Sequence, residues 1–419
     1  MSVFPLMVSS KISAHADRNI TRLHEPYPAD PAPAALLASA AIAAPDSRID
    51  NRQAMPEMLP RRAFLTALAG LPVAVAKVAR ANSLRDLARA KNITFGSEVT
   101  CADIADQNYA NLVARECAIM TPGIEAKWGS TEPAEGRFRF GPMDDLAQFA
   151  ADAGLCLHMH NLIWAVGLPN WTLAALQAGR GRAVMQNHIA AVAGRYRGRV
   201  RSWDVVNEPI DPRWPADRNG LCTTPWRLGV GTDFIMDALA DTALADPTAR
   251  LMINDDDLEY DMPDRDKKRT GYLRLIEDLL RRGAPLHGFG LEAHVKPWLP
   301  IAEKPYRRFL HELAGFGLKL HVTEFDVNDR LMPGNADARD ALVAAVARHY
   351  LDLVLDEPAV VTLITWGLSD RSTWMLRDPT GHRADGLAPR PLPYDLDLQP
   401  KKMRAAIADA LYFARERPA

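Results

Sequence analysis

Residues 203–210 read WDVVNEPI, an apolar run that ends in an amide, a carboxylate and a proline. Such a run is typical of a strand buried on both faces of a parallel sheet. Pro209 has no backbone N–H and ends the pairing, so Asn207 and Glu208 stand where the strand stops. A buried strand that ends in two polar side chains predicts a functional site at that end.

The chain from about residue 84 onward alternates short apolar runs with amphipathic stretches. This alternation predicts parallel β–α units, and about 335 residues for eight units fit a single-domain (β/α)₈ TIM barrel. A doubly wound sheet is the alternative, but the segment FGSEVT at 95–100 lacks its glycine-rich phosphate turn. The expected strands are 93–98, 117–121, 155–160, 200–207, 250–254, 288–292, 319–324 and 363–366, and the expected helices are 143–153, 183–195, 234–245, 267–282, 305–316 and 336–355.

Polar and aromatic residues gather at the carboxyl ends of these strands, where barrel enzymes place their chemistry. The fourth and seventh strands lie on opposing walls, so Glu208 and Glu324 are expected to face each other. Two facing carboxyl groups are the minimum equipment for cleaving an acetal. The expected rim residues are His158, His160, Trp164, Asn207, Glu208, Asn254, Asp255, Glu292, His294, Glu324, Asp326 and Trp366.

Several motifs resemble those of glycoside hydrolase family 10, the endo-β-1,4-xylanases. They are WDVVNEP at 203–209, HVTEFDV at 321–327, HNLIW at 160–164 and WGLSDRSTW at 366–374. Lys127-Trp128 with STEPAEGRFRF after it, and PLPYDLDLQPK at 391–401, extend the resemblance over residues 84–413. It implies cleavage of internal β-1,4 linkages of xylan or a related polysaccharide, without a cofactor or metal.

The resemblance also implies roles for single residues. Glu208 matches the acid/base and Glu324 the nucleophile of a retaining double displacement, with the two carboxyl groups about 5–5.5 Å apart. His294 and Asp326 match a pair that orients the nucleophile, and Asn207 matches the group that binds the sugar 2-hydroxyl. The positions that match substrate-binding residues are Lys127, His160, Trp164, Asn207, Glu292, Trp366 and Trp374.

Sugar recognition departs from the family pattern. Gly123-Ile124 replace a Glu-Asn pair that grips a sugar two places from the cleavage point, Ala165 replaces a histidine, and Glu292 replaces a glutamine. A third carboxyl group near the nucleophile is expected to alter the local titration. These changes favour a decorated xylan, or a bacterial exopolysaccharide with a β-1,4-linked backbone, over plain xylan.

Two other functions stay open at this point. His158, His160 and His294, with Asp255, have residue types suited to the metal site of a metal-dependent barrel hydrolase. A non-catalytic glycan-binding barrel is the second alternative, although a pure binder needs neither Glu208 nor Glu324. Among other residues, Asp255-Asp256-Asp257 are expected in a solvated loop, and Trp171, Trp214 and Trp226 suit either the cleft or the core.

Composition excludes some classes of protein. The formal net charge is -2 and 48% of residues are hydrophobic, so neither the basic stripe of a nucleic-acid binder nor an acidic disordered chain is expected. No apolar run is long enough for a membrane span in the mature form. The four cysteines show no C-x-x-C spacing. The expected partner is a polysaccharide substrate, bound by a monomer.

The first 81 residues differ from the rest. Residues 1–57, rich in Ala and Pro, are expected to be a disordered extension or a mis-called start. Residues 58–81 resemble a twin-arginine export signal, with Arg61-Arg62 before a short apolar stretch and Ala79-Arg80-Ala81 as the cleavage pattern. The catalytic domain is therefore expected at 82–419, in a protein exported to the periplasm or the medium.

Overall fold

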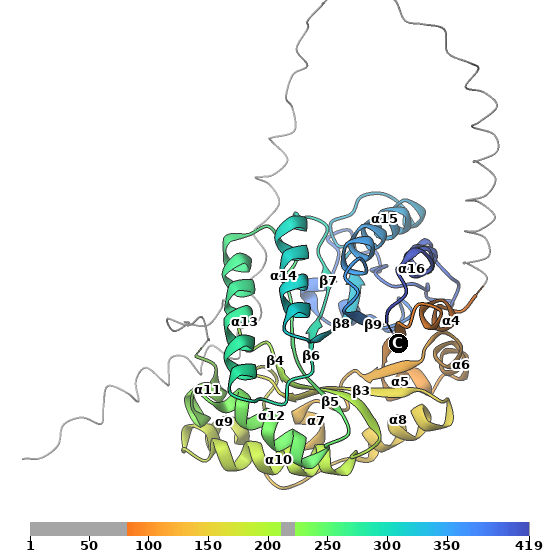
Figure 1. Cartoon of the computed structure of the whole chain (residues 1–419). Coiled ribbons are helices and arrows are strands. Elements are labelled where there is room, and N and C mark those ends of the chain that lie inside the picture. Colours follow the sequence, from red (N-terminus) through yellow and green to blue (C-terminus); the bar gives the residue numbers. More distant parts are fainter. Residues whose placement is uncertain (1–81, 211–222, 419) are drawn as a thin grey trace, which may run out of the picture. The chain divides into compact units, whose positions relative to one another are not determined.

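The folded body is a closed barrel of parallel strands surrounded by helices (Figure 1). The computed structural model describes residues 82–210 and 223–418, which belong to one compact unit, Ala79–Ala419. Within these ranges eight strands form the ring, because β1 pairs with β9 and β6 pairs with β8. The predicted (β/α)₈ barrel is confirmed. The ring consists of β1 (Thr94–Val99), β2 (Ile119–Pro122), β3 (Cys156–Ile163), β4 (Val200–Asn207), β5 (Arg250–Asp255), β6 (Gly288–Leu291), β8 (Lys319–Val327) and β9 (Val360–Thr365).

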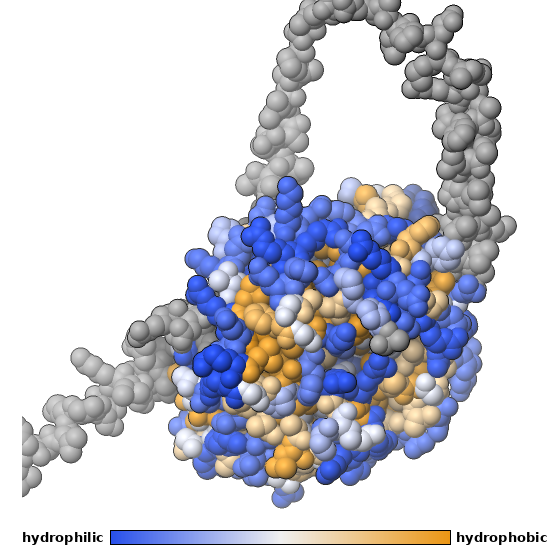
Figure 2. All heavy atoms as spheres, viewed as in Figure 1, coloured by the Kyte–Doolittle hydropathy of each residue, from blue (hydrophilic) through white to orange (hydrophobic). Residues whose placement is uncertain are grey.

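Helices connect the strands and cover the outside of the barrel (Figure 1). In α14, the buried residues Tyr306, Phe309, Leu310 and Leu313 recur every three or four positions, which places one apolar face against the sheet. The face of the molecule in Figure 2 is mainly hydrophilic, with smaller hydrophobic areas between the polar residues. The helices are α4 (Leu84–Arg89), α5 (Cys101–Ile104), α6 (Gln107–Glu116), α7 (Trp128–Thr131), α8 (Gly141–Asp152), α9 (Asn170–Gln177), α10 (Gly181–Arg195), α11 (Pro225–Val230), α12 (Phe234–Ala245), α13 (Pro263–Arg281), α14 (Glu303–Gly315), α15 (Ala336–Val354) and α16 (Lys402–Phe413), with 3₁₀ turns η3 (Trp374–Leu376) and η4 (Pro379–Gly381).

Buried ion pairs join the two ends of this body. Arg404 on α16 donates to the backbone oxygen of Asn82 at 2.7 Å and lies 3.2 Å from the Glu116 carboxylate on α6. Glu116 also accepts from the backbone N–H of Leu84, the first residue of α4. These contacts hold α16 against α4 and α6 on the outside of the barrel.

Strand order agrees with the prediction, but some strand ends do not. The predicted strand 200–207 coincides with β4, whereas β9 begins three residues before the predicted 363–366. Val360 pairs with Leu320 on β8, and the sequence gives no sign of that register. The predicted strand 288–292 ends at Leu291, and the short β7 (His294–Val295) follows it and pairs with the far end of β8.

Several predictions fall outside the described residues. They are the extension at 1–57, the signal at 58–81, Trp214 and Cys222. The described cysteines, Cys101, Cys117 and Cys156, are free thiols. None of the helices in 82–210 and 223–418 combines the length and the apolar character that a bilayer span requires.

Candidate active site

The end of β4 delivers two functional groups in one turn of backbone. Asn207 is the last residue of the strand, and Glu208 follows it with a left-handed φ of 49°. Non-glycine residues adopt this conformation rarely, and strained positions of this kind cluster at functional sites. The Glu208 N–H donates to the backbone oxygen of Asn254 at 2.9 Å, which fixes the turn against β5. The Asn207 amide donates to Glu208 Oε1 at 3.3 Å.

Asn254 on β5 links the two predicted catalytic carboxyl groups. Its Nδ2 donates to Asn207 Oδ1 at 2.9 Å, and lies 3.1 Å from both Glu324 Oε1 and Glu292 Oε1. Thr323 Oγ1 donates to Asn254 Oδ1 at 2.7 Å and fixes the orientation of the amide. Although β5 and β6 separate β4 from β8 in the ring, hydrogen bonds run from Glu208 through Asn207 and Asn254 to Glu324. The structure therefore assembles the predicted pair in one network.

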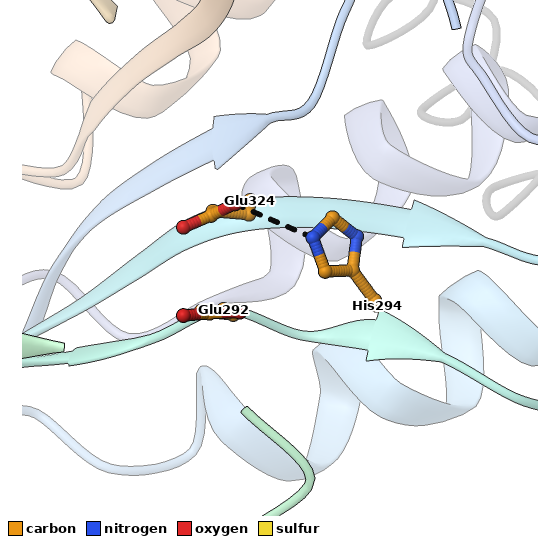
Figure 3. A group of neighbouring side chains, drawn as sticks. All are labelled: Glu292, His294 and Glu324. Atoms are coloured by element: carbon orange, nitrogen blue, oxygen red, sulfur yellow. Dashed lines mark hydrogen bonds and ion pairs between the residues drawn. The ribbon is translucent and has the colours of Figure 1, made fainter. Parts of the chain in front are cut away.

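Glu324 on β8 is flanked by an imidazole and a carboxyl group (Figure 3). His294, at the start of β7, places Nε2 3.3 Å from Glu324 Oε2 and Nδ1 3.0 Å from Asp326 Oδ2. Trp374 Nε1 donates to the same Asp326 oxygen at 2.8 Å. In Figure 3 the carboxyl groups of Glu292 and Glu324 point to the same side, and the His294 ring faces Glu324. The predicted orienting pair, His294 and Asp326, thus contacts the predicted nucleophile.

A buried carboxylate inside the barrel positions the histidine of β3. Asp204, fully buried on β4, lies 2.9 Å from His160 Nδ1 and 2.9 Å from His158 Nε2. His158 Nδ1 bonds in turn to Ser202 Oγ at 2.9 Å. His160 Nδ1 also lies 3.5 Å from Glu324 Oε1. Asp204 therefore positions both histidines, and through His160 it reaches the site.

Aromatic rings and one ammonium group form the more exposed part of the site. Lys127 Nζ lies 4.6 Å from the ring centroid of Trp164 and 5.8 Å from that of Trp366. The Trp366 ring meets His160 and His294 edge to face, with centroids 5.4 and 6.1 Å apart. Lys127 and Trp164 are partly exposed, whereas Trp366 is buried. All five residues belong to the predicted substrate-binding set or the orienting pair.

Glu324 and Glu292 titrate in opposite directions although they are neighbours. Burial acts to raise the pKa of Glu324, but the imidazoles of His160 and His294 and the ammonium of Lys127 outweigh it and leave the pKa below its ordinary value. At Glu292, burial followed by repulsion from Glu324 raises the pKa well above its ordinary range. The site therefore favours an ionised Glu324 beside a protonated Glu292.

The pKa values of the two imidazoles, His294 and His160, also shift in opposite directions. Burial acts to lower the pKa of His294, but Asp326 and Glu324 outweigh it and raise that pKa to about 10. For His160, burial and the positive charge of Lys127 lower the pKa despite the acidic neighbours. At neutral pH the protonated imidazole next to Glu324 is therefore that of His294.

The metal site considered from the sequence is not assembled in the described residues. His158 and His160 both turn a nitrogen to Asp204, and neither groups with His294 or Asp255. The cluster with metal-like spacing is instead Glu292, His294 and Glu324, whose oxygen and nitrogen atoms lie within 4.8 Å of one another. Within this cluster His294 Nδ1 is hydrogen-bonded to Asp326 at 3.0 Å, and its Nε2 lies 3.3 Å from Glu324 Oε2.

The prediction of a solvated loop after β5 is wrong. Asp255 is 1% exposed and lies 2.6 Å from Lys268 Nζ, which is itself buried. Asp256 pairs with the same ammonium at 2.6 Å, and Asp257 lies 2.9 Å from Lys296. The basic partners come from α13 and from the segment after β7, so they are distant in sequence and give no local signal.

Two further residues of the site region had no predicted role. Asn254 was expected only as a strand end, and its amide proves to join Asn207, Glu292 and Glu324. Glu98, the penultimate residue of β1, is a buried carboxyl group at the same end of the barrel. Of the tryptophans, Trp226 is buried against Trp128, with ring centroids 5.0 Å apart, and belongs to the core.

Comparisons with known proteins agree with this geometry. The family model described as glycosyl hydrolase family 10 matches residues 83–410. Endo-1,4-beta-xylanase B of Humicola insolens is 34% identical over 292 residues, covering 67% of this chain and 75% of that protein. Endo-1,4-beta-xylanase B of Thermotoga neapolitana is 29% identical over 307 residues, covering 73% and 84%. The crystal structure of native xylanase 10B from Thermotoga maritima superposes with a TM-score of 0.69 at 29% identity, covering 78% of this chain and 98% of that one.

Proposed function

The chain belongs to glycosyl hydrolase family 10 and is a glycoside hydrolase, and we propose that it cleaves internal β-1,4 linkages of a xylan-like polysaccharide with retention of anomeric configuration. Relatives that are named endo-1,4-beta-xylanases support the substrate class. The observation that carries the mechanism is the hydrogen-bonded path from Glu208 through Asn207 and Asn254 to Glu324.

In the first step Glu324 is the nucleophile and Glu208 the acid. A Glu324 carboxylate oxygen attacks the anomeric carbon, the glycosidic C–O bond breaks, and Glu208 gives its proton to the departing oxygen. The lowered pKa of Glu324, which His160 and His294 produce against the effect of burial, supplies the ionised carboxylate this step needs. Its closest cation, His294, is held by Asp326.

In the second step the ester to Glu324 is hydrolysed. Water attacks the anomeric carbon while Glu208, now a carboxylate, takes its proton, and the ester bond breaks to restore Glu324. Esterification removes the negative charge of Glu324 and makes Glu208 easier to ionise, so one residue serves first as acid and then as base. Asn207, next to Glu208, is placed to bind the sugar 2-hydroxyl.

Sugar recognition is proposed to differ from that of plain xylanases. Gly123 has no side chain, and Ile124 is 53% exposed, so neither supplies the polar contacts that the family pattern has there. We expect a decorated xylan, or a bacterial exopolysaccharide with a β-1,4-linked backbone, to be cleaved faster than linear xylan. Initial rates on linear xylan, arabinoxylan and glucuronoxylan measure this, and a clear preference for linear xylan contradicts it.

Variants of the two glutamates test the catalytic roles. Glu324→Ala should lose hydrolysis of 4-nitrophenyl β-xylobioside, and proton NMR of the wild-type reaction should show the β-anomer as the first product. Glu208→Gln should lose about 10²–10⁴-fold on unsubstituted xylo-oligosaccharides, but much less on aryl glycosides, whose leaving group needs no proton. Full activity of Glu324→Ala, or an α-anomer as first product, rules out the double displacement.

Export is proposed as well, because the substrate is a polymer and because 58–81 resemble a twin-arginine signal. Replacing Arg61 and Arg62 together by lysine should keep the protein in the cytoplasm of a bacterial host. Fractionation followed by activity assay measures this, and unchanged export of the double variant contradicts it. The monomeric state stays a prediction, to be measured by size-exclusion chromatography with light scattering.

A further inference from the structure

A carboxyl group near the end of β1 has no hydrogen-bond or ion-pair partner among the residues that the structure describes. Glu98 is 3% exposed, yet its side chain makes no hydrogen bond or ion pair with any residue in 82–210 or 223–418. Its two oxygens are not among the fully enclosed unpaired atoms, so the little exposure that remains lies on them. Leaving a buried polar group unpaired costs about 1–3 kcal/mol, and such a group opening to solvent points to a ligand.

Gly123, the residue after the neighbouring strand β2, leaves space for this carboxyl group. A Cβ on Gly123 would lie 1.8 Å from Glu98 Oε1 and 2.8 Å from its carboxyl carbon. Gly123 does not have a left-handed φ, so the backbone alone does not require glycine there. Gly123 is therefore required for space, and the side chain of Glu98 fills the place that a side chain at 123 would take.

The neighbours of Glu98 show which part of the site it belongs to. Besides burial and acidic neighbours, the cations that act on its titration are Arg377 and Lys127, while Glu324 and Glu208 are not among its main influences. Lys127, in contrast, responds first to burial and then to Glu324. The geometry gives the position: Glu98 Oε1 occupies the place of a side chain at 123, and Glu98 Oε2 lies 3.9 Å from where a Cβ on Gly367, next to Trp366, would be. Position 123 is where the family pattern has a residue that grips the sugar two places from the cleavage point.

The protonation of Glu98 suits sugar hydroxyl groups. Burial, followed by the negative charge of Asp103, raises the pKa of Glu98 well above its ordinary range. A protonated carboxyl group both donates and accepts hydrogen bonds, as a hydroxyl group does. This matches a neutral sugar better than a cationic ligand, which an ionised carboxylate would favour.

We infer that Glu98 is a substrate-binding residue that hydrogen-bonds the hydroxyl groups of the second sugar on the non-reducing side of the cleavage point, and that Gly123 makes room for it. The inference rests on the proposed function, because the family resemblance implies that Lys127 binds sugar on the non-reducing side and that residues 123 and 124 replace the pair that grips a sugar two places from the cleavage point. Glu98 on β1 then supplies a carboxyl contact to the sugar at a place where Gly123 and Ile124, which follow β2, have no polar side chain.

The test compares two aryl glycosides that differ only in this second sugar. Glu98→Ala should lower kcat/KM on 4-nitrophenyl β-xylobioside about 10–100-fold, the range for a hydrogen bond to a polar acid group, and change it less than about threefold on 4-nitrophenyl β-xyloside. Glu98→Gln, which keeps a donor and an acceptor, should recover most of the loss. An equal fall on both substrates would mean a purely structural role and overturns the inference.

Gly123→Ala provides independent evidence, because its added methyl group displaces the Glu98 carboxyl group. It should reproduce the selective loss on the xylobioside, and adding it to Glu98→Ala should cause little further loss. Gly194→Ala, on α10 with open space around the new methyl group, is the matched control and should have no effect. A Gly123→Ala variant with wild-type kinetics on both substrates overturns the inference.

Failure of the proposed function is distinguishable from failure of this inference. A wild-type enzyme that cleaves neither aryl glycoside overturns the proposed function. Titration calorimetry with xylobiose then tests Glu98 without catalysis. Weaker binding by Glu98→Ala than by the wild type supports the inference, and equal binding, or none by either, overturns it.

Discussion

Replacing Glu292 by glutamine should stabilise the protein at alkaline pH and leave its stability unchanged at acid pH. The substitution keeps the shape of the side chain and the oxygen that accepts from Asn254, and removes a group that titrates. Burial and repulsion from Glu324 raise the pKa of Glu292 in the folded state. The stability that this group contributes is therefore fully present below its unfolded pKa, near 4.3, and is lost as pH rises towards the folded pKa.

The distance between the two carboxyl groups sets the magnitude. Oxygens of Glu292 and Glu324 lie no more than 4.8 Å apart, and two unit charges at that distance repel by about 3.5 kcal/mol at an effective dielectric constant of 20. Unfolding entropy scales as about 2.1 cal/mol/K per residue, and the folded unit has roughly 340 residues. The expected gain of Glu292→Gln at pH 8 is therefore about 5 °C in Tm, and close to zero at pH 4.

Differential scanning calorimetry of the wild type and the variant at pH 4, 6 and 8 measures the effect. Glu277→Gln, on the exposed face of α13 with no partner among the described residues, is the control and should shift Tm by less than about 1 °C at each pH. A Tm difference for Glu292→Gln that is the same at pH 4 and pH 8 would refute the reasoning, since only a titrating group makes the difference grow with pH.

Three other substitutions have expected outcomes that calorimetry or kinetics can check. Asp204→Asn should lower the free energy of unfolding by about 3 kcal/mol at pH 7. Because its histidine partners lower the pKa of Asp204 against the effect of burial, the difference in Tm between variant and wild type should become smaller below pH 4. Trp374→Phe removes the donor to Asp326 and should lower kcat about tenfold with Tm nearly unchanged. Lys268→Met leaves the buried carboxyl group of Asp255 unpaired and should cost about 3–5 kcal/mol, or about 4–7 °C in Tm.

Most of the barrel could be predicted because its signals are local. The segment 200–207 is apolar, and a proline soon follows it, so the bounds of β4 come directly from the sequence. Helix α12 (Phe234–Ala245) is likewise predicted to the residue. The start of β9 is different, because Val360 belongs to the sheet only through its pairing with Leu320, a residue forty positions away. Strand ends of this kind depend on register, which only the folded chain contains.

The residues of the site likewise fall into those that local sequence predicts and those that depend on contacts between distant segments. Glu208 and Glu324 are predictable, since both stand within recognisable motifs and Glu208 directly follows the end of β4. Asn254 is not, because its importance arises from hydrogen bonds to residues on β4 and β8 and to Glu292, just after β6. Glu98 is hidden for another reason. A glutamate on a strand has no special meaning until the missing Cβ of Gly123, just after the neighbouring strand β2, shows that the two positions share one space.

The carboxyl groups of Glu208, Glu292 and Glu324 share one buried site, where like charges repel. The partners of Glu292 and Glu324 differ, and this difference decides which of the two is ionised. Glu324 has His294 at 3.3 Å and His160 at 3.5 Å, whereas the side-chain partner of Glu292 among the described residues is the neutral amide of Asn254. Since burial penalises the charge on both, the imidazoles decide which one ionises. An ionised Glu324 then repels a second negative charge nearby and keeps Glu292 protonated. The placement of His294 on the short β7 therefore determines which carboxyl group is the nucleophile. Moving that ring away should raise the pKa of Glu324, so that the site loses its ionised carboxylate while the protein still folds.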